Sequence, residues 1–392
     1  ELNYYFLNFN QVKVSTIIDE NFFKFNVTGD ESTGNITIPD SALEQPIDID
    51  LLTIRIKDQF PKEADDSVNK ITEDTLSEHE DVLVSDSQPM PPIKVQCQEC
   101  IYNNQDFGPT LINQTPIKNG NSFTVNRKDN TLLGTNIIGD WSRDSDGKVF
   151  TQLSGSFESE NVGNLFSIFN LNSGIRDTSI KVEGNLRWHG DLTQINFKSL
   201  TGKMDIDGGK GSQEYVSDKG ARIFSILSLG SLARKLTLDF SDLFEDGFFY
   251  TDLKANVDIN NGVFSTTDFE ITGTSADVEI IGSSDFVNNH IENCILVNPD
   301  LSASLPILAG WAIEPVTGLV VFLMSKIFQP ALKVVTSIQY KVEGSFEDPT
   351  ITEIGKSAGT AIVDNTGETV GQTVIRPDPE QPKFSCDGAF NN

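Results

Sequence analysis

The chain has 392 residues, enough for roughly two or three compact domains or for one long β structure. Its formal charge of −28, from 57 acidic and 29 basic residues, repels phosphate backbones and therefore argues against nucleic-acid binding. Abundant Asn, Asp, Ser, Thr and Gly, beside few Trp and Met, favours strands and turns over a helical bundle.

Short alternating apolar runs predict a β segment over residues 1–56, which we expect to continue the apolar-lined groove of the later strands. The apolar residues recur at every second position between Gly and Pro punctuation: Val12 and Val14; Phe23, Phe25 and Val27; Ile36 and Ile38; Ile47, Ile49 and Leu51. Residues 57–92 then lose this period and accumulate Asp, Glu and Pro, which indicates an acidic linker or loop. No leader peptide precedes the first strand, so we expect Glu1 to lie inside a longer protein.

Cys97 and Cys100 form a lone CxxC at the end of the strand pattern that begins at Ile93. A local disulfide or a pair of unreactive thiols accounts for this spacing most simply. Metal or redox chemistry stays open as the minor alternative, although no second cysteine pair and no nearby histidine supports it.

Strands resume at Ile93 and continue to about residue 350, and hairpin dipeptides predict tight turns at Asn119-Gly120, Asp146-Gly147, Asp207-Gly208 and Asn261-Gly262. Alternation places one apolar and one polar face on these strands. We expect a mainly β fold, a long twisted antiparallel sheet curled into an open apolar-lined groove with a few short helices. The expected groove-face residues are Ile180, Val182, Leu186, Trp188, Met204, Ile206, Leu236, Leu238, Phe240, Val257, Ile259, Val278, Ile280, Ile338, Tyr340 and Val342.

Two segments depart from the two-residue period. Residues 218–233 place apolar side chains at helical spacing, with Asp218 as the N-cap, and predict a short amphipathic helix. Residues 302–335 are apolar nearly all round and are broken by proline, which predicts one or two helices that are buried or lie against lipid and do not cross a bilayer. After Pro349 the composition predicts a mobile tail over 351–392.

No constellation of residues supports catalysis, so we expect no enzyme activity, no cofactor and no metal site. His79, His189 and His290 are isolated in sequence, and a shared metal site would require three distant segments to converge. Asp239 and Asp242 flank an extended dipeptide, and carboxylates so placed suit turn capping better than the two sides of a glycosidic bond.

The order of motifs from about Val182 onward resembles the C-terminal region of the YhdP family, within the AsmA-like group. The segment 236–248, with the run LDFSDLF followed by Gly247-Phe248, is the most specific piece, and 340–349 agrees with it. The resemblance covers roughly residues 135–350 and is weak over 1–134. Residues 57–92 and the long tail depart from the family pattern.

This resemblance implies a long periplasmic β-groove in a protein anchored to the inner membrane of a Gram-negative-type envelope. The family is associated with moving phospholipid toward the outer membrane, so phospholipid acyl chains are the implied ligand of the apolar face. A one-sided sheet can equally hide that face in an ordinary dry core. A structural module of the envelope therefore stays open as the alternative, and a carbohydrate hydrolase is the least supported function.

Overall fold

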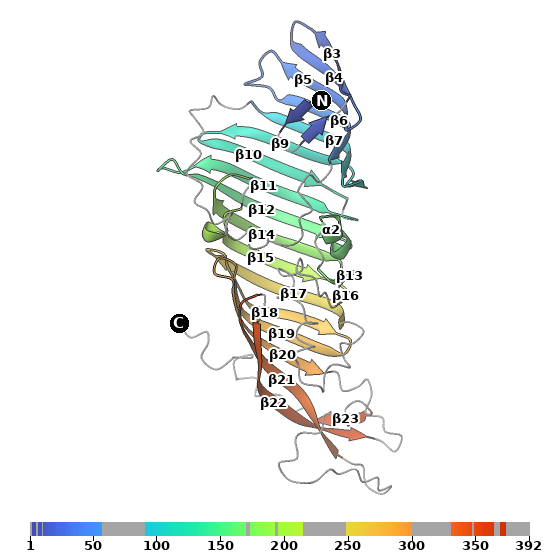
Figure 1. Cartoon of the computed structure of the whole chain (residues 1–392), viewed down its shortest axis with the longest axis vertical. Coiled ribbons are helices and arrows are strands. Elements are labelled where there is room, and N and C mark those ends of the chain that lie inside the picture. Colours follow the sequence, from blue (N-terminus) through green and yellow to red (C-terminus); the bar gives the residue numbers. More distant parts are fainter. Residues whose placement is uncertain are drawn as a thin grey trace. The chain divides into compact units, whose positions relative to one another are not determined.

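The computed structural model describes the chain in segments. These are residues 2–4, 7–9, 11–56, 91–129, 131–169, 173–192, 195–214, 248–299, 331–346, 349–363 and 369–373. The predicted fold class is confirmed: the chain is mainly β, a long, open, curled antiparallel sheet with one α-helix in the described segments (Figure 1). Its contacts group into two compact units, which we describe separately.

Unit 1 comprises residues 1–172, 177–206 and 258–262. Its strands are β1 (Leu2–Tyr4), β2 (Leu7–Phe9), β3 (Lys13–Ile18), β4 (Phe22–Thr28), β5 (Ser32–Pro39), β6 (Ile47–Ile56), β7 (Ile93–Tyr102), β8 (Gln105–Asp106), β9 (Thr110–Ile117), β10 (Gly120–Arg127), β11 (Gly134–Arg143), β12 (Val149–Ser159), β14 (Ile180–His189) and most of β15 (Thr201–Gly208). In Figure 1 the strands β9, β10, β11, β12 and β14 lie side by side. The β segment predicted over residues 1–56 thus consists of strands.

One pair in unit 1 departs from the predicted antiparallel arrangement. Strands β6 and β7 are parallel, with Ile47 opposite Ile93 and Ile56 opposite Tyr102. A parallel pair requires a long crossover between its strands, and the chain between Ile56 and Ile93 is long enough to supply one. Sequence alternation reports the face of a side chain but carries no signal for strand direction.

A short helix that the sequence analysis did not predict interrupts unit 1. Helix α2 (Val162–Ile168) begins after Asn161, whose side-chain Oδ1 accepts a hydrogen bond from the Asn164 backbone N–H at 3.0 Å. Val162 and Leu165, one turn apart, are buried. The Asn161 cap followed by this spacing was the available signal, but seven residues are too few for a clear helical period. A 3₁₀ turn, η1 (Phe197–Ser199), precedes β15.

Unit 2 comprises residues 173–176, 207–257 and 263–392. Its strands are β13 (Ile175–Arg176), β16 (Gly211–Gln213), most of β17 (Phe248–Asn260), β18 (Val263–Gly273), β19 (Ala276–Asp285), β20 (His290–Pro299), β21 (Ala331–Gly344), β22 (Pro349–Val363) and β23 (Thr369–Thr373). Strands β18 to β23 pair antiparallel in chain order. A dense apolar core lines one face of this unit, as described below.

Three of the four predicted hairpin dipeptides lie at turns between strands. Asn261 and Gly262 both have positive φ, 49° and 78°, as a tight turn between antiparallel strands requires. Gly147 also has positive φ, and Asn119 precedes the start of β10. The prediction at Asp207-Gly208 is wrong, because both residues belong to β15, whose last residue is Gly208.

The predictions for the C-terminal third need correction where the structure describes it. Residues 331–335 were predicted to be helical but belong to β21, since the β-branched Val334, Val335 and Thr336 suit a strand. The tail predicted from residue 351 includes β22 and β23, because β22 pairs with β21 along its length. The predicted helix 218–233, residues 302–330 of the second, and nearly all of the acidic linker 57–92 lie outside the described residues.

Candidate functional site

The pairing register collects the apolar residues of unit 1 on one face of its sheet. Residues directly opposite each other on neighbouring strands share a face. Following these partners from strand to strand gives one row from β3 to β14: Thr16, Phe25, Ile36, Ile49, Val95, Ile112, Val125, Ile137, Gly155 and Gly184. We call the face that carries this row the apolar face.

Further residues extend the apolar face on both sides of that row. Val14 lies opposite Val27, and Ile18 opposite Phe23. Phe123, Gly139, Leu153 and Leu186 form a second row across β10, β11, β12 and β14. The intervening positions point to the other side of the sheet and are largely polar: Lys24, Asn26, Asn35, Thr37, Asp48, Asp50, Lys94, Gln96, Asn113 and Thr124.

Much of the apolar face of unit 1 is open to solvent. The exposed fractions are 56% for Val14, 74% for Ile18, 40% for Phe23 and 36% for Ile112. Phe25, Ile36, Ile49, Val95, Val125 and Ile137 are half-buried. An apolar surface of this extent left in contact with water is typical of a site that binds an apolar partner.

Side chains of two neighbouring strands cover Gly139 on the apolar face. A Cβ added at Gly139 would lie 2.4 Å from Cζ of Phe123 and 2.6 Å from Cδ2 of Leu153. The ends of these two side chains therefore lean over the glycine, and both residues are only half-buried. A larger residue in place of Gly139 would therefore require these side chains to move.

The strands of unit 2 also alternate apolar and polar residues, but here the apolar side chains are buried. Across β18 to β21 the partners Ile271, Val278, Val297 and Ile338 form one row, and Phe269, Ile280, Ile295 and Tyr340 form the next. The exposed fraction of Val278 is 1% and that of Ile338 is 0%. This face of unit 2 is packed like the interior of an ordinary domain.

The residues predicted to line the groove therefore divide between two environments. In unit 1, Val182, Trp188 and Ile259 are buried, while the others are half-buried on the strand face opposite their charged neighbours: Ile180, Leu186, Met204 and Ile206. In unit 2, Val257 is half-buried and the rest are buried: Val278, Ile280, Ile338, Tyr340 and Val342. Leu236, Leu238 and Phe240 lie outside the described residues.

Sequence reasoning omitted the most accessible part of this face from its site residues. Phe23, Phe25, Ile49, Val95 and Ile112 carry the same two-residue period as the predicted residues. The signal was thus present, and only the register, which links β3 to β14 through the parallel pair, shows that all these residues share one face.

Three polar side chains on the apolar face each bury an atom that has no hydrogen-bond partner within the described structure: Gln114, Arg127 and Thr135. The amide of Gln114 donates through Nε2 to Oδ1 of Asn121 at 2.5 Å, which leaves its Oε1 without a donor. Buried polar atoms usually have partners, so these positions are candidates for contacts with a polar part of a ligand.

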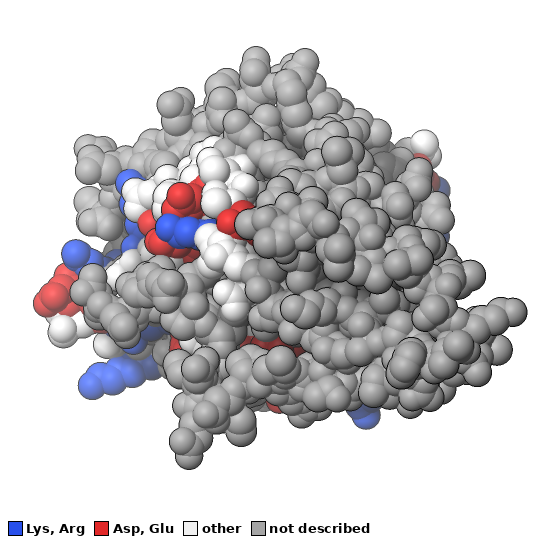
Figure 2. Space-filling view, turned by 90° about the horizontal axis from the view of Figure 1, so that it is seen from below, with Lys and Arg blue, Asp and Glu red and all other residues white. Residues whose placement is uncertain are grey.

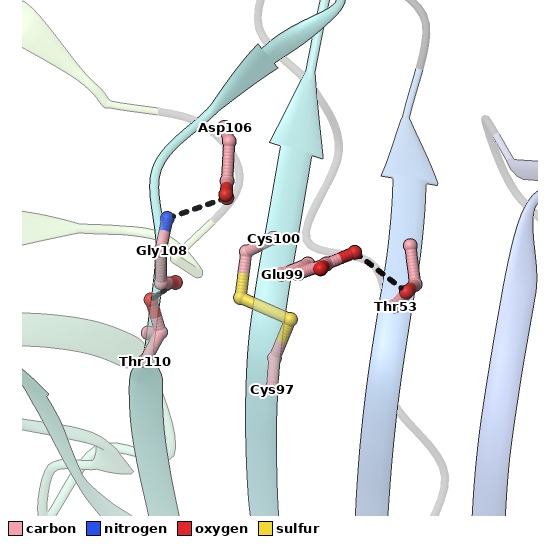
Figure 3. The surroundings of a disulfide bond; sticks show 7 residues. All are labelled: Thr53, Cys97, Glu99, Cys100, Asp106, Gly108 and Thr110. Atoms are coloured by element: carbon pink, nitrogen blue, oxygen red, sulfur yellow. Dashed lines mark hydrogen bonds between the residues drawn. A yellow bond between two sulfur atoms is a disulfide. The ribbon is translucent and has the colours of Figure 1, made fainter.

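The CxxC is a local disulfide. Cys97 and Cys100 are bonded within β7, and Cys97 is buried beside Thr110 of β9 (Figure 3). On the opposite side of the strand, Oγ1 of Thr53 on β6 donates to Oε2 of Glu99 at 3.0 Å. The disulfide lies within β7, and the hydrogen bond joins β7 to its parallel neighbour β6.

Several basic side chains of the described residues lie beside carboxylates. Figure 2 shows Lys or Arg side chains beside Asp or Glu side chains on the described surface that is visible from below. The pairs include Lys341 with Glu292 at 3.6 Å and Lys203 with Asp258 at 2.6 Å. Exposed pairs of this kind contribute little to stability.

Of the histidines and the aspartate pair considered as catalytic or metal-binding candidates, only two histidines lie within the described residues. His189 and His290 are exposed at the end of β14 and the start of β20, whereas His79, Asp239 and Asp242 lie outside the described residues. Where side chains are described, no three metal-ligating groups come together. No helix in that same part of the chain is long and apolar enough to span a membrane.

The chain is similar to a known protein family over most of its length. The family model described as "YhdP protein" matches residues 1–351, which include residues 1–134, where the resemblance in sequence motifs is weak. The chain is 28% identical over 270 residues to "Intermembrane phospholipid transporter YhdP" of Escherichia coli (strain K12). That alignment covers 67% of this chain but only 21% of the relative. No solved structure matches.

Proposed function

This chain belongs to the YhdP family, and on that basis we propose that it carries phospholipid, with the acyl chains lying along the apolar face of unit 1. The observation that supports this most directly is the continuous, partly exposed row from Thr16 to Gly184. Contact with acyl chains would remove that apolar surface from water at a gain of about 25 cal/mol per Å².

The length of the row favours a conduit over a pocket for a single ligand. Neighbouring strands are about 4.8 Å apart, so a row that crosses from β3 to β14 runs for roughly 43 Å. Half the hydrocarbon core of a bilayer is only about 15 Å thick. One acyl chain would therefore occupy a fraction of the row. The rest of the row offers further apolar positions to which the lipid can move.

We further propose that the chain works in the periplasm of a Gram-negative-type envelope, as part of a protein anchored to the inner membrane that moves phospholipid toward the outer membrane. The supporting observations are the family match and the name of the relative, an intermembrane phospholipid transporter. The chain spans about a fifth of that relative. Its contacts with the inner and outer membranes are therefore part of what we propose.

A second candidate function is a non-enzymatic structural or scaffolding module of the envelope. The buried face of unit 2 favours it, since Val278, Ile280 and Ile338 pack as in a dry core. The relative is named a phospholipid transporter, and neither of the two candidate functions requires a catalytic residue.

Two adjacent isoleucines on β11 provide a matched test. Ile137 lies on the apolar face and is half-buried, whereas Ile138 points to the other side and is 54% exposed. The same substitution, Ile137→Asp or Ile138→Asp, adds the same charge to the same strand. We expect Ile137→Asp to remain folded, because the carboxylate can reach water on an open face, at a loss of about 1–3 kcal/mol.

The measurement is the phospholipid extracted per mole of washed protein, together with thermal stability. The proposal expects bound phospholipid to fall severalfold in Ile137→Asp and to stay at the wild-type level in Ile138→Asp. Equal lipid in all three proteins would show that the apolar face of unit 1 is not the path. Absence of lipid from the wild type, even after incubation with phospholipid vesicles, would favour the scaffolding function.

A further inference from the structure

Arg127 is a charged residue on the apolar face, at the end of strand β10. It lies directly opposite Thr135 of β11, and the same line of partners continues to Phe157 and Val182. Only 7% of Arg127 is exposed. Arginine is rarely buried this deeply unless its guanidinium is paired, so its contacts need to be accounted for.

The contacts within the described structure leave part of the guanidinium without a partner. Nε donates to the carbonyl oxygen of Leu133, and the group lies over the ring of Phe107, 5.5 Å from its centroid. Nη1 is buried and has no hydrogen-bond partner. A Cβ added at Gly108 would lie 3.8 Å from both Nη1 and Nη2, so the loop before β9 passes close to both nitrogens without bonding to them.

The nearest carboxylates, those of Asp106 and Asp129, each bind a backbone N–H with one oxygen and also act on Arg127 through their charges. Oδ1 of Asp106 accepts from the Gly108 backbone N–H at 2.7 Å, and Oδ1 of Asp129 accepts from the Thr131 backbone N–H at 3.0 Å. Burial lowers the pKa of Arg127, while the charges of Asp129 and then Asp106 oppose this shift. A guanidinium remains protonated in proteins, so the site keeps a buried positive charge.

Thr135 adds a second unsatisfied group at the same place. Its Oγ1 is buried and also has no partner in the described part of the chain. Side chains directly opposite on paired strands have Cβ atoms about 5 Å apart, so one ligand oxygen group can reach both. An unpaired buried donor is costly, and two of them on one apolar face indicate a ligand that supplies the acceptors.

We propose that Arg127 and Thr135 bind the phosphate group of a phospholipid whose acyl chains lie on the adjacent apolar face. This inference rests on the proposed function and adds a headgroup contact to it. The planar fork of a guanidinium suits two phosphate oxygens, and the threonine hydroxyl can donate to one of them. The formal charge of −28 repels free anions, whereas an amphiphile is retained by its apolar part.

The test compares ligands with and without a phosphate. Binding of phosphatidylglycerol, of a diacylglycerol with the same acyl chains, and of inorganic phosphate alone is measured on the delipidated 392-residue chain. For Arg127→Gln we expect affinity for phosphatidylglycerol to fall by about 10- to 100-fold, the usual cost of a lost hydrogen bond to a charged group. Affinity for diacylglycerol should not change, and inorganic phosphate alone should bind poorly.

The control is Arg187→Gln, which removes the same charge from the other side of the sheet. There Arg187 is exposed and stacks on Phe150 at 4.2 Å, so phosphatidylglycerol affinity should stay at the wild-type level. Thr135→Val keeps the shape and the buried cation, and should lower phosphatidylglycerol affinity by about threefold to tenfold. It also tests the site if Arg127→Gln fails to fold, which thermal unfolding will reveal.

Three outcomes would overturn the inference. In the first, the wild type and both site variants bind phosphatidylglycerol equally. In the second, the site variants lose diacylglycerol as strongly as phosphatidylglycerol, which would make Arg127 a structural residue. In the third, inorganic phosphate binds as tightly as the lipid and with the same dependence on Arg127. Failure of the wild type to bind either lipid would instead contradict the proposed function.

Discussion

Ile49 of β6 and Val95 of β7 lie directly opposite each other in the parallel pair of unit 1. Through this contact the apolar residues of β3 to β5 share a face with those of β9 to β14. Had β7 entered the sheet one residue out of register, its apolar side chains would have moved to the polar side. The shared register is what makes the apolar face continuous.

We predict that a valine-to-aspartate substitution destabilises unit 2 far more than unit 1. Val278→Asp places an unpaired carboxylate at a position with 1% exposure and should cost several kcal/mol, enough to unfold unit 2. Val14→Asp, at 56% exposure, should change the free energy of unfolding by about 0.5 kcal/mol or less. Limited proteolysis and thermal unfolding measure both. A folded, stable Val278→Asp protein would contradict a packed core in unit 2.

The disulfide should contribute stability without contributing to binding. It closes a very short loop, so the chain-entropy model assigns it about 2 kcal/mol or less. We expect the double variant Cys97→Ala, Cys100→Ala to unfold at a lower temperature and to retain its phospholipid. Calorimetry and lipid extraction check this. Loss of lipid from a variant that stays folded would show that the region around β7 is itself part of the path.

The sequence predicted the strands well, because a strand that buries one face carries an apolar residue at every second position. The Ile180–His189 strand has buried or half-buried apolar residues alternating with exposed charged ones, as predicted. The tight turn at Asn261-Gly262 was equally visible, since few residue types tolerate positive φ at both positions. Strand identity and turn chemistry are local properties.

Other features could not be predicted because they depend on contacts between distant segments. The parallel β6–β7 pair, the polar contacts of Arg127 and the difference in exposure between Ile112 and Val278 are set by register and packing, which a local pattern does not report. Alternation gave Val278 and Phe25 the same signature, yet the first is buried and the second half-buried. The sequence therefore predicted an apolar strand face, but not which of its residues are exposed and which are buried.

A pH-dependent contribution to stability is expected from Asp268, in the irregular part of β18. Burial is the largest influence on this carboxylate and raises its pKa, but hydrogen bonds from Asn256 and Thr266 together hold the pKa below its ordinary 3.8. The Asn256 backbone and side chain donate to it at 2.9 and 2.7 Å. A pKa lowered by folding stabilises the protein above the unfolded value of about 3.9, and that stability is lost as the pH falls through the folded value.

We therefore expect Asp268→Asn to be less stable than the wild type at pH 7 and the two to converge as the pH falls below about 4. Asp205→Asn, at an exposed position of β15, is the control and should follow the wild type throughout. Urea unfolding between pH 7 and pH 3 gives the comparison. A stability difference that persists unchanged at pH 3 would point to packing and not to the carboxylate.

Replacing Gly139 tests, without any ligand, whether the apolar face is open. A methyl group at this position would meet Phe123 and Leu153, so one or both side chains must move. In a closed core such overpacking costs about 1–3 kcal/mol. On an open face the phenyl ring can swing toward solvent, and replacing a strand glycine by alanine restores about 0.4–1 kcal/mol through the unfolded chain.

For Gly139→Ala we therefore expect the free energy of unfolding to stay within about 1 kcal/mol of the wild type. Gly282→Ala in unit 2 is the contrasting variant, because its new Cβ would lie 2.3 Å from the backbone oxygen of Glu292, where nothing can move aside cheaply. Denaturant unfolding of both variants measures the difference. If Gly139→Ala is as damaging as Gly282→Ala, the side chains above Gly139 are held as tightly as a core, and the apolar face of unit 1 has no room for acyl chains at that point.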